Sequence, residues 1–266
     1  MSSKRIEPDV ARLYHLHSSH ERERSAEPEV DLLRPKARFR TFPGSSRTPL
    51  PGRDFAVEMT LGTALRERRS IRDLALRPLS LETLGRLLHT SYGVRGHRLS
   101  GGEHAYDRPS PSAGGRYPLE IHLAVQQVEG LADGVYHYDA RAHELEHRSL
   151  GGFHDRLAEL ALGQEMVRSA NLLIAITAVR DRTMWKYGQR GYRYVWLDAG
   201  HVGQNIYLVA TALGLGPTAI GGFYDREVNA LLSLPEDEEA IYLLSVGQPA
   251  DSAPEPTLPL GSGGSE

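Results

Sequence analysis

Three guanidiniums and one hydroxyl lie within five positions of this sequence, at Arg68, Arg69, Ser70 and Arg72. Guanidiniums bind phosphate through paired hydrogen bonds, and a hydroxyl can bind a sugar-like chain. Taken alone, such a cluster is more often the solvated basic end of a helix. Two further segments of the chain suit the same kind of ligand, and together they make the cluster a candidate phosphate site.

Both of these segments are rich in small residues. Pro111, Ser112 and Ala113 precede Gly114-Gly115 and a strand predicted over 121–125, and Gly221-Gly222 follow another predicted strand. Glycine lets a backbone approach a ring or a phosphate closely, and the second pair would expose N–H groups to an electron-accepting ring atom. An ordinary loop and a plain turn are the alternatives. The first segment, Ser112-Ala113-Gly114-Gly115, lacks both the spacing of a dinucleotide fingerprint and the pattern of a P-loop.

The elements that must position these segments indicate an α+β fold with a mixed sheet, because strands and helices do not alternate strictly. A helix starts at Leu61 and ends in 68–72, Ser80 caps the next one, and the longest runs from about 192 to 213 with a continuous apolar stripe. The strand over 121–125 alternates apolar and polar residues, which predicts that the loop before it is anchored at a sheet edge. The remaining predicted elements are a glycine-rich loop over 93–102, a hairpin over 134–139 and 144–147, helices over 155–162 and 225–232, and strands over 171–179, 219–223 and 240–246.

We expect one domain over 58–250, preceded by a polar extension over 1–57 and followed by a flexible tail over 251–266. The extension has scattered prolines and too few apolar residues to form a core of its own. Its basic run, Arg34, Lys36, Arg38 and Arg40, is expected to be simply solvated, and contact with the acidic surface of a partner is the alternative. The tail is rich in glycine and serine.

The composition excludes several classes of protein. The absence of cysteine excludes disulfides, thiolate metal sites and cysteine nucleophiles, and it fits a reducing cytoplasm. The net charge of −3 gives no indication of a nucleic-acid partner. No apolar run approaches the length of a membrane span, and the histidines lack metal-ligand spacing. We therefore expect a soluble, cytoplasmic protein with no metal, nucleic-acid or membrane partner.

Four motifs in order resemble those of the nitroreductase-like flavoproteins. The similarity covers roughly 59–249, and within that superfamily the sequence is similar to the SagB-type branch, the azoline dehydrogenases that make thiazoles and oxazoles in peptides. Each motif alone is weak, but their order is specific. They are Arg-Arg-Ser-x-Arg at 68–72, Ser-Ala-Gly-Gly-Arg-Tyr-Pro-Leu-Glu at 112–120, Ala-Leu-Gly-Leu-Gly at 212–216 and Ile-Gly-Gly-Phe at 220–223.

The resemblance implies a nitroreductase-like fold: a mixed, mainly antiparallel sheet flanked by helices, with a long central helix. It also implies an intertwined homodimer with two flavin mononucleotide (FMN) sites at its interface. Arg68, Ser70 and Arg72 would bind the phosphate and ribityl chain, with Arg69 as a further contributor. The ring would be contacted by Pro111, Ser112 and Ala113 on its pyrimidine side, by Gly221 and Gly222 near N5, and by Asn205 from the long helix.

In this branch a Lys-Tyr pair, here Lys186-Tyr187, is associated with catalysis. Oxidation of a thiazoline requires loss of an acidic proton together with hydride transfer from the adjacent ring carbon to the flavin. A lysine beside an apolar ring is a usable base, and the tyrosine could orient it or share the proton. A solvated lysine beside a packing tyrosine is the alternative when the pair is considered without the family.

The resemblance thus implies an FMN-dependent dehydrogenase that oxidises azoline rings in a ribosomally made peptide and is re-oxidised by dioxygen. Its implied partners are the peptide and a cyclodehydratase that makes the ring. An NAD(P)H-dependent nitroreductase or flavin reductase is an alternative, although a reductase needs no substrate base. A flavin-binding scaffold without turnover is another, against which the presence of Lys186-Tyr187 argues.

Overall fold

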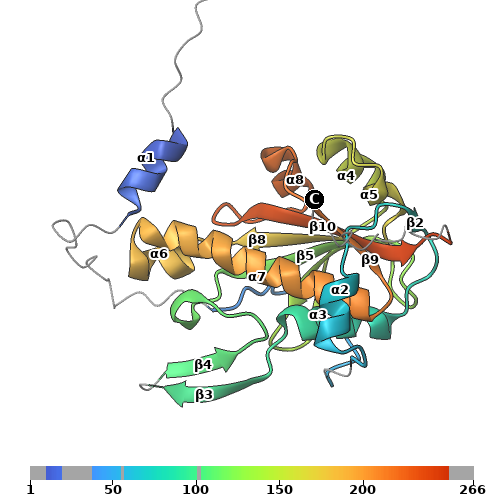
Figure 1. The fold of residues 1–266 in the computed structure, drawn as a ribbon, viewed down its shortest axis with the longest axis horizontal. Coiled ribbons are helices and arrows are strands. Elements are labelled where there is room, and N and C mark those ends of the chain that lie inside the picture. The colour runs from blue at the N-terminus through green and yellow to red at the C-terminus, as the bar shows by residue number, and fades with distance from the viewer. Residues whose placement is uncertain (1–9, 20–37, 55–56, 101–102, 252–266) are drawn as a thin grey trace, which may run out of the picture.

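An antiparallel sheet carries helices on both faces in the computed structural model, which describes residues 10–19, 38–54, 57–100 and 103–251 (Figure 1). Its strand order is β1-β7-β6-β5-β8-β10-β2, and β9 also pairs with β10. The strands are β1 (Arg47–Pro49), β2 (Leu74–Ala75), β5 (Leu119–Val125), β6 (Gly134–Asp139), β7 (Glu144–Leu150), β8 (Leu172–Ala178), β9 (Gly216–Ile220) and β10 (Glu239–Pro249). The ladders between them are antiparallel, and the predicted α+β, mainly antiparallel architecture is confirmed.

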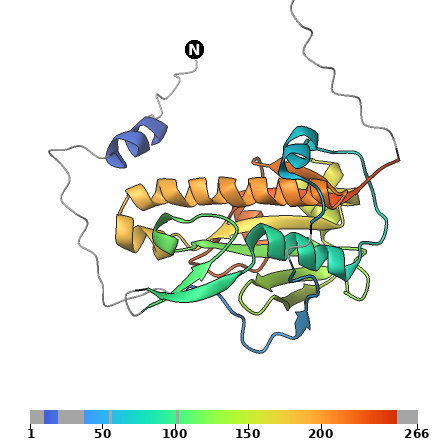
Figure 2. The ribbon, with the colours of Figure 1, turned by 60° about the horizontal axis from the view of Figure 1, so that its bottom comes forward.

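One face of the sheet is covered by α7 (Arg190–Ala212), with α3 (Leu81–Tyr92) beside it (Figure 2). The stripe predicted on the long helix is buried there, with Val195, Ala199, Val202 and Ile206 in the same core as the β5 side chains. Ser80 caps α3 as predicted, because its side chain accepts the Thr83 N–H. This packing fixes α7 against the middle of the sheet.

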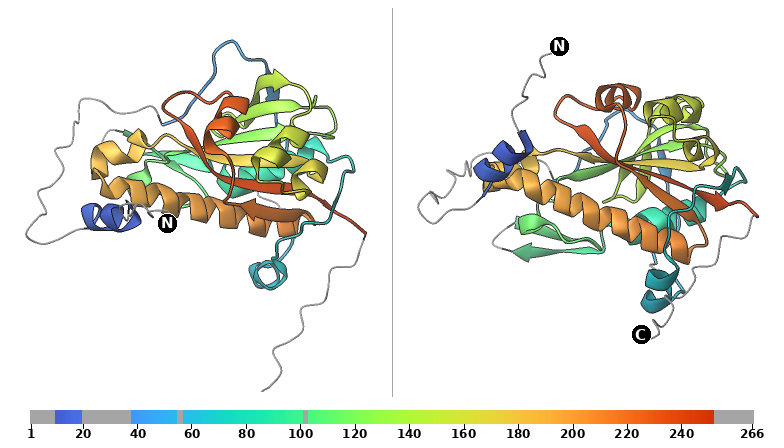
Figure 3. Two further views of the ribbon diagram at one scale, coloured as in Figure 1. Left: turned by 90° about the horizontal axis from the view of Figure 1, so that it is seen from above. Right: turned by 45° about the horizontal axis from the view of Figure 1, so that its top comes forward.

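The opposite face carries α4 (His154–Leu160), α5 (Met166–Ser169) and α8 (Asp225–Leu231), as Figure 3 shows. These helices pack on apolar side chains such as Ala124, Leu173 and Leu243. Three helices remain: α1 (Val10–His17), α2 (Leu61–Glu67) and α6 (Asp181–Tyr187), which forms a helical hairpin with α7. A short 3₁₀ turn, η1 (Ala113–Gly115), precedes β5.

Two sequence predictions about the fold are wrong. The glycine-rich loop over 93–102 is largely a separate hairpin, because β3 (Gly96–Ser100) pairs with β4 (Glu103–Asp107). The loop before β5 is not at a sheet edge, since β5 lies between β6 and β8. All seven β5 residues are buried, and the alternating Glu120 and His122 find polar partners inside the protein instead of solvent.

Parts of the predicted extension contact the domain. Residues 47–49 form β1 at the edge of the sheet, paired with β7. Helix α1 lies against the start of α7, where the Tyr14 and Tyr192 rings meet edge to face at 5.3 Å. The predicted tail, beyond Asp251, lies outside the described residues. Across the described part of the chain, no helix is both long enough and apolar enough to span a bilayer.

Two helix glycines, Gly85 at a buried position and Gly62 at an exposed one, give opposite predictions for replacement by alanine. A Cβ at Gly85 on α3 would collide with the carbonyl oxygen of Pro51, whereas a Cβ at Gly62 on α2 meets nothing within 4 Å. Gly85→Ala should lower the free energy of unfolding by about 1–3 kcal/mol. Gly62→Ala should raise it by about 0.5 kcal/mol, because alanine loses less backbone entropy in a helix. Urea denaturation measures both, and destabilisation of equal size would contradict this packing.

Candidate functional site

Arg68 and Ser70 converge on Tyr207 of α7. Arg68 is the C-terminal cap of α2, and its guanidinium carbon lies 5.5 Å from the centre of the Tyr207 ring. The hydroxyls of Ser70 and Tyr207 are 2.8 Å apart, and the same Tyr207 oxygen accepts the Ala219 N–H at 2.8 Å. The tyrosine therefore ties the basic segment after α2 to strand β9.

This arrangement brings the glycine pair to the same region. Gly221 and Gly222 are exposed and follow β9 directly, only two and three residues after Ala219. Because an extended strand rises about 3.3 Å per residue, Gly221 lies within about 7 Å of Ala219. We call Arg68 and Ser70, with Tyr207, the phosphate-end group, and Gly221 and Gly222 follow the strand that Tyr207 binds.

The guanidiniums of this segment suit an anion. Among the described residues, Arg68, Arg69 and Arg72 form no ion pair, whereas the neighbouring Arg66 pairs with Glu67 at 3.4 Å. Arg69 faces a different cleft of about 150 Å³, lined by Glu67, Ile71, Thr211, Gly214, Leu215 and Pro249. The Arg69 Nε is buried there without a hydrogen-bond partner.

Asn205 does not join this group. Its amide Nδ2 donates to the Ser91 carbonyl oxygen at 3.2 Å and so bridges α7 to the end of α3. Its predicted contact with a flavin ring stays a prediction.

The second glycine-rich loop lies beside the predicted catalytic pair. Gly114 has a left-handed backbone with φ of 58°. A Cβ at this position would collide with the Tyr187 hydroxyl and would lie 3.3 Å from Lys186 Nζ. Both side chains come from α6, and the Lys186 ammonium lies 5.3 Å from the centre of the Tyr187 ring. The absence of a side chain at residue 114 therefore gives Lys186 and Tyr187 access to the loop.

Asp198 of α7 holds this loop in place. Its Oδ2 accepts the Ser112 hydroxyl at 2.5 Å, and its carboxylate also accepts the Ala113 N–H. Ser112 Oγ in turn accepts the Tyr117 N–H at 2.9 Å. Burial raises the pKa of Asp198 to about 6, although these hydrogen bonds and the nearby His201 act in the opposite direction.

The second group therefore consists of Ser112, Ala113, Gly114, Lys186 and Tyr187, with Asp198, and we call it the ring-end group. Asp198 and Tyr207 anchor the two groups on one helix, nine residues apart. At a rise of 1.5 Å per residue this separates them by about 14 Å along α7. Pro111 is exposed beside the ring-end group.

Sequence reasoning missed the parts of both groups that come from distant elements. Tyr207 lies next to the apolar stripe of α7, and nothing local distinguishes its hydroxyl from that of any packing tyrosine. Asp198 belongs to a polar stripe with His201 and Asn205, a signal that could have found it. Its buried position beside Ser112 depends on how α7 crosses the loop.

A cationic cavity of about 620 Å³ lies at the base of the β3–β4 hairpin. The described residues that line it include three arginines and no carboxylate, so it suits an anionic ligand. They are Arg53, His89, Val94, Arg95, Gly96, His97, Tyr106 and Arg141. A search of the described segments finds no group of three or more His, Cys, Asp or Glu residues that could hold a metal ion.

Sequence comparisons connect the chain to flavin enzymes and to a peptide-processing protein. A model of the Nitroreductase family matches residues 65–248. The nitroreductase-like protein MJ1384 of Methanocaldococcus jannaschii is 38% identical over 191 residues, which cover 72% of this chain and 92% of that protein. The microcin B17-processing protein McbC of Escherichia coli is 27% identical over 163 residues, which cover 59% of this chain and 58% of McbC.

Solved structures share the fold. A nitroreductase-like protein from Anabaena variabilis superposes with a TM-score of 0.75 at 30% identity, and the match covers 90% of this chain but only 46% of that one. A chain of the E. coli microcin synthetase McbBCD complex, solved with truncated pro-MccB17 bound, superposes with a TM-score of 0.61 at 22% identity. That match covers 91% of this chain and 92% of the other.

The raised pKa of Asp198 predicts a pH-dependent stability. The folded chain binds this proton more tightly than the unfolded chain, whose carboxyl has a pKa near 3.8. The contribution of Asp198 to the free energy of unfolding therefore falls as the pH rises from about 4 to about 6, by roughly 1–3 kcal/mol. Asp198→Asn should lack this fall, so the variant should gain stability relative to the unaltered protein across that window. Urea denaturation at several pH values measures the difference, and parallel curves would contradict the assignment.

Proposed function

The chain belongs to the nitroreductase family, whose members are generally flavin oxidoreductases, and from its two site groups we propose an activity. We propose that it is an FMN-dependent dehydrogenase of the SagB type, which oxidises thiazoline or oxazoline rings in a ribosomally made peptide. The products are thiazoles or oxazoles. Each oxidation removes one proton and one hydride from the ring.

The observation that carries this proposal is the approach of Lys186 and Tyr187 to the loop at Gly114. Two motifs that are 72 residues apart, counted from Gly114 to Lys186, meet at the loop that the family resemblance assigns to the ring of FMN. A reductase that receives a hydride from a nicotinamide needs no base at this point. A dehydrogenase that removes an acidic proton from its substrate does.

The residues present fit FMN. Arg68, Ser70 and Arg72 would bind its phosphate and ribityl chain, and the unpaired guanidiniums of this segment have the right charge. Arg69 would contribute from its own side of the segment. Pro111, Ser112 and Ala113 would line the pyrimidine side of the ring, with Asn205 near it and the N–H groups of Gly221 and Gly222 near N5. The chemistry that FMN supplies when bound is acceptance of a hydride at N5, with re-oxidation by dioxygen.

The side chains of the ring-end group divide the remaining work. Lys186 removes the acidic proton of the azoline, and Tyr187 orients the lysine or shares its proton. Asp198 keeps Ser112 and Ala113 at a fixed distance from α7, so the loop that would line the flavin ring stays beside Lys186.

A homodimer is part of the proposal. Large apolar side chains lie exposed on α2 and α7, with Leu61 66%, Leu65 53% and Leu197 59% accessible. Arg68 caps the end of α2 and Tyr207 is on α7, so a second copy that covers both helices would also cover this end of the flavin site. The likeness to McbC, and to a chain of the McbBCD complex, supports a peptide substrate and a cyclodehydratase partner.

An NAD(P)H-dependent reductase is the second candidate. The cationic cavity at Arg53, Arg95 and Arg141 favours it, since the guanidiniums would bind the phosphates of a dinucleotide. A flavin-binding scaffold without turnover needs no general base, so it gives no reason for Lys186 to lie beside the loop. The Lys186 variants below separate these three functions.

Arg68 and Arg66 form a matched pair for FMN binding. Arg68→Ala should weaken FMN binding by about 10–100-fold, because a charged hydrogen-bond donor to the phosphate is lost. Arg66→Ala should leave the affinity unchanged, since Arg66 is 72% exposed and pairs with Glu67. Fluorescence titration of the apoprotein with FMN measures both dissociation constants. Equal changes in the dissociation constants of the two variants would contradict the assignment of Arg68 to the phosphate site.

Lys186→Ala should retain FMN and lose azoline oxidation by about 10²–10⁴-fold, because the general base is missing. Lys186→Arg is the matched variant: it keeps the positive charge but cannot be deprotonated. A base predicts equal loss in both variants, whereas a purely electrostatic role predicts that Lys186→Arg stays active. Product formation is followed by the mass loss of two hydrogens per ring. Full activity in Lys186→Ala would refute the catalytic assignment.

A further inference from the structure

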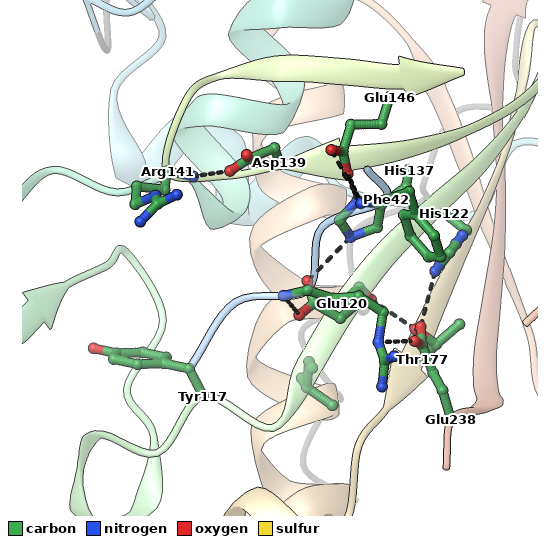
Figure 4. A network of polar contacts seen from close by, with 12 residues as sticks. Phe42, Tyr117, Glu120, His122, His137, Asp139, Arg141, Glu146, Thr177 and Glu238 are labelled. Atoms are coloured by element: carbon green, nitrogen blue, oxygen red, sulfur yellow. Dashed lines mark hydrogen bonds and ion pairs between the residues drawn. The ribbon is translucent and has the colours of Figure 1, made fainter. Parts of the chain in front are cut away.

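A buried polar network lies on the sheet face opposite α7, beneath Phe42 (Figure 4). Its side chains come from five elements and are all buried, which is unusual for charged groups. We call it the His-Glu network. Its members are Glu120 and His122 on β5, His137 on β6, Glu146 on β7, Thr177 on β8, and Glu238 before β10.

His137 bridges two carboxylates in this network. Its Nδ1 lies 2.9 Å from Glu146 Oε2, and its Nε2 lies 3.2 Å from Glu120 Oε2. Burial favours the neutral ring, but these two hydrogen bonds raise the pKa of His137 to about 9. Burial likewise favours the neutral acid of Glu120, whose pKa is nevertheless held at about 2 by Arg182 and His137. His137 and Glu120 are therefore both charged at neutral pH.

The two carboxylates also hold the segment that covers them. The Arg40 N–H donates to Glu120 Oε1 at 2.8 Å, and the Phe42 N–H donates to Glu146 at 3.2 Å. The Arg40 side chain forms ion pairs with Asp237 and Glu238, each at 2.7 Å, so the prediction that it is simply solvated is wrong. Glu120 and Glu146 thus share one imidazole, and each binds one backbone N–H of the covering segment.

Each carboxylate also binds one arginine, but from different elements. Glu146 Oε1 lies 2.6 Å from the Arg47 guanidinium on β1, whereas the arginine of Glu120 is on α6. Glu120 Oε1 lies 2.6 Å from the Arg182 guanidinium, and both side chains are about 95% buried. Arg182 is on α6, one helical turn before Lys186. Its other nitrogen donates to the Tyr117 carbonyl oxygen at 3.3 Å. Arg182 therefore joins the start of α6 to the end of the loop that carries Gly114.

Helix α6 depends on such an anchor. It has seven residues and lacks a side-chain cap at its N-terminus. Helices this short are marginal without tertiary contacts. Tyr117 likewise has a left-handed backbone, with φ of 48°, which a tyrosine adopts only when its surroundings hold it there. One buried ion pair therefore contacts both elements that present the ring-end group.

From these contacts we infer that Glu120 and Arg182 are positioning residues. Their ion pair fixes α6 and the loop from 111 to 117 relative to each other, so that Lys186 and Tyr187 lie beside Gly114. The inference rests on the proposed function for the role of Lys186, but the geometry of α6 can be tested without it. Loss of Glu120 leaves Arg182 buried beside an uncharged partner, which favours displacement of α6.

The test compares Glu120→Gln with its matched control Glu146→Gln in the FMN-loaded protein. Both variants weaken the bond to His137, one bond to the covering segment and one arginine pair, with Arg182 for Glu120 and with Arg47 for Glu146, so both should lose stability. Hydrogen exchange, followed by mass spectrometry, should become faster over residues 181–188 only in Glu120→Gln. The kcat for azoline oxidation should fall by about 10²-fold in Glu120→Gln, as expected for a displacement near 1 Å, with a smaller change in KM. Glu146→Gln should keep its kcat.

Arg182 supplies the second pair of variants if Glu120→Gln does not fold. Arg182→Met should reproduce the faster exchange of α6, and Arg182→Lys, which keeps the charge, should restore part of its protection. Unchanged exchange over 181–188 in Glu120→Gln or in Arg182→Met would overturn the inference, and so would equal exchange and kcat in Glu120→Gln and Glu146→Gln. If exchange changes as expected while Lys186→Ala stays active, the positioning role stands and the proposed function fails.

Discussion

Buried carboxylates hold the loop from residue 111 to 117 at both of its ends. Asp198 on α7 binds its beginning through Ser112 and Ala113, and Glu120 on β5 binds its end through Arg182 and Tyr117. The sheet lies between these two carboxylates, with α7 on one face and the His-Glu network on the other. The loop therefore has a defined place relative to both faces, and α6 is drawn to it by the same arginine.

These contacts favour geometry more than stability. Removing charges from water costs several kcal/mol per ion, and a buried pair regains this only where its hydrogen bonds are complete. Here Glu120 binds His137, Arg182 and the Arg40 N–H, so these three partners compensate its charge. A short uncapped helix and a left-handed tyrosine are kept in place as a result. In the phosphate-end group an uncharged side chain has the same positioning role, because the Tyr207 hydroxyl binds both Ser70 and Ala219.

Much of the fold follows from local patterns. Periodicity and capping chemistry, which are visible in the sequence, predict the stripe on α7, the Ser80 cap and the two strands of the hairpin over 134–147. The place of β5 does not follow, because the alternation of Glu120 and His122 looks like that of a half-solvated strand. Their partners come from residues 137 and 238, and only the assembled sheet brings these together. The β3–β4 hairpin was not predicted, because the glycines in this segment indicate a loop.

The candidate site divides in the same way. Its motifs could be found from their residue types and from their order, since all four occur along the chain in the order that the family resemblance requires. Which motifs touch could not, because Gly114 and Lys186 are joined by the crossing of α6 and α7. Tyr207 and Arg182 act through contacts across the chain, and no short pattern marks them. Asp198 lies on a polar stripe of α7, but its contact with Ser112 depends on how α7 crosses the loop.

Anaerobic reduction of the FMN-loaded protein tests the central claim most directly. The visible absorbance of the flavin is recorded after mixing with a peptide that contains a thiazoline, and separately with NADPH. A substrate-fed dehydrogenase predicts that the peptide bleaches the flavin and becomes a thiazole, while NADPH alone leaves the yellow colour. Rapid bleaching by NADPH, with no reaction of the peptide, would contradict the proposed function and indicate a reductase.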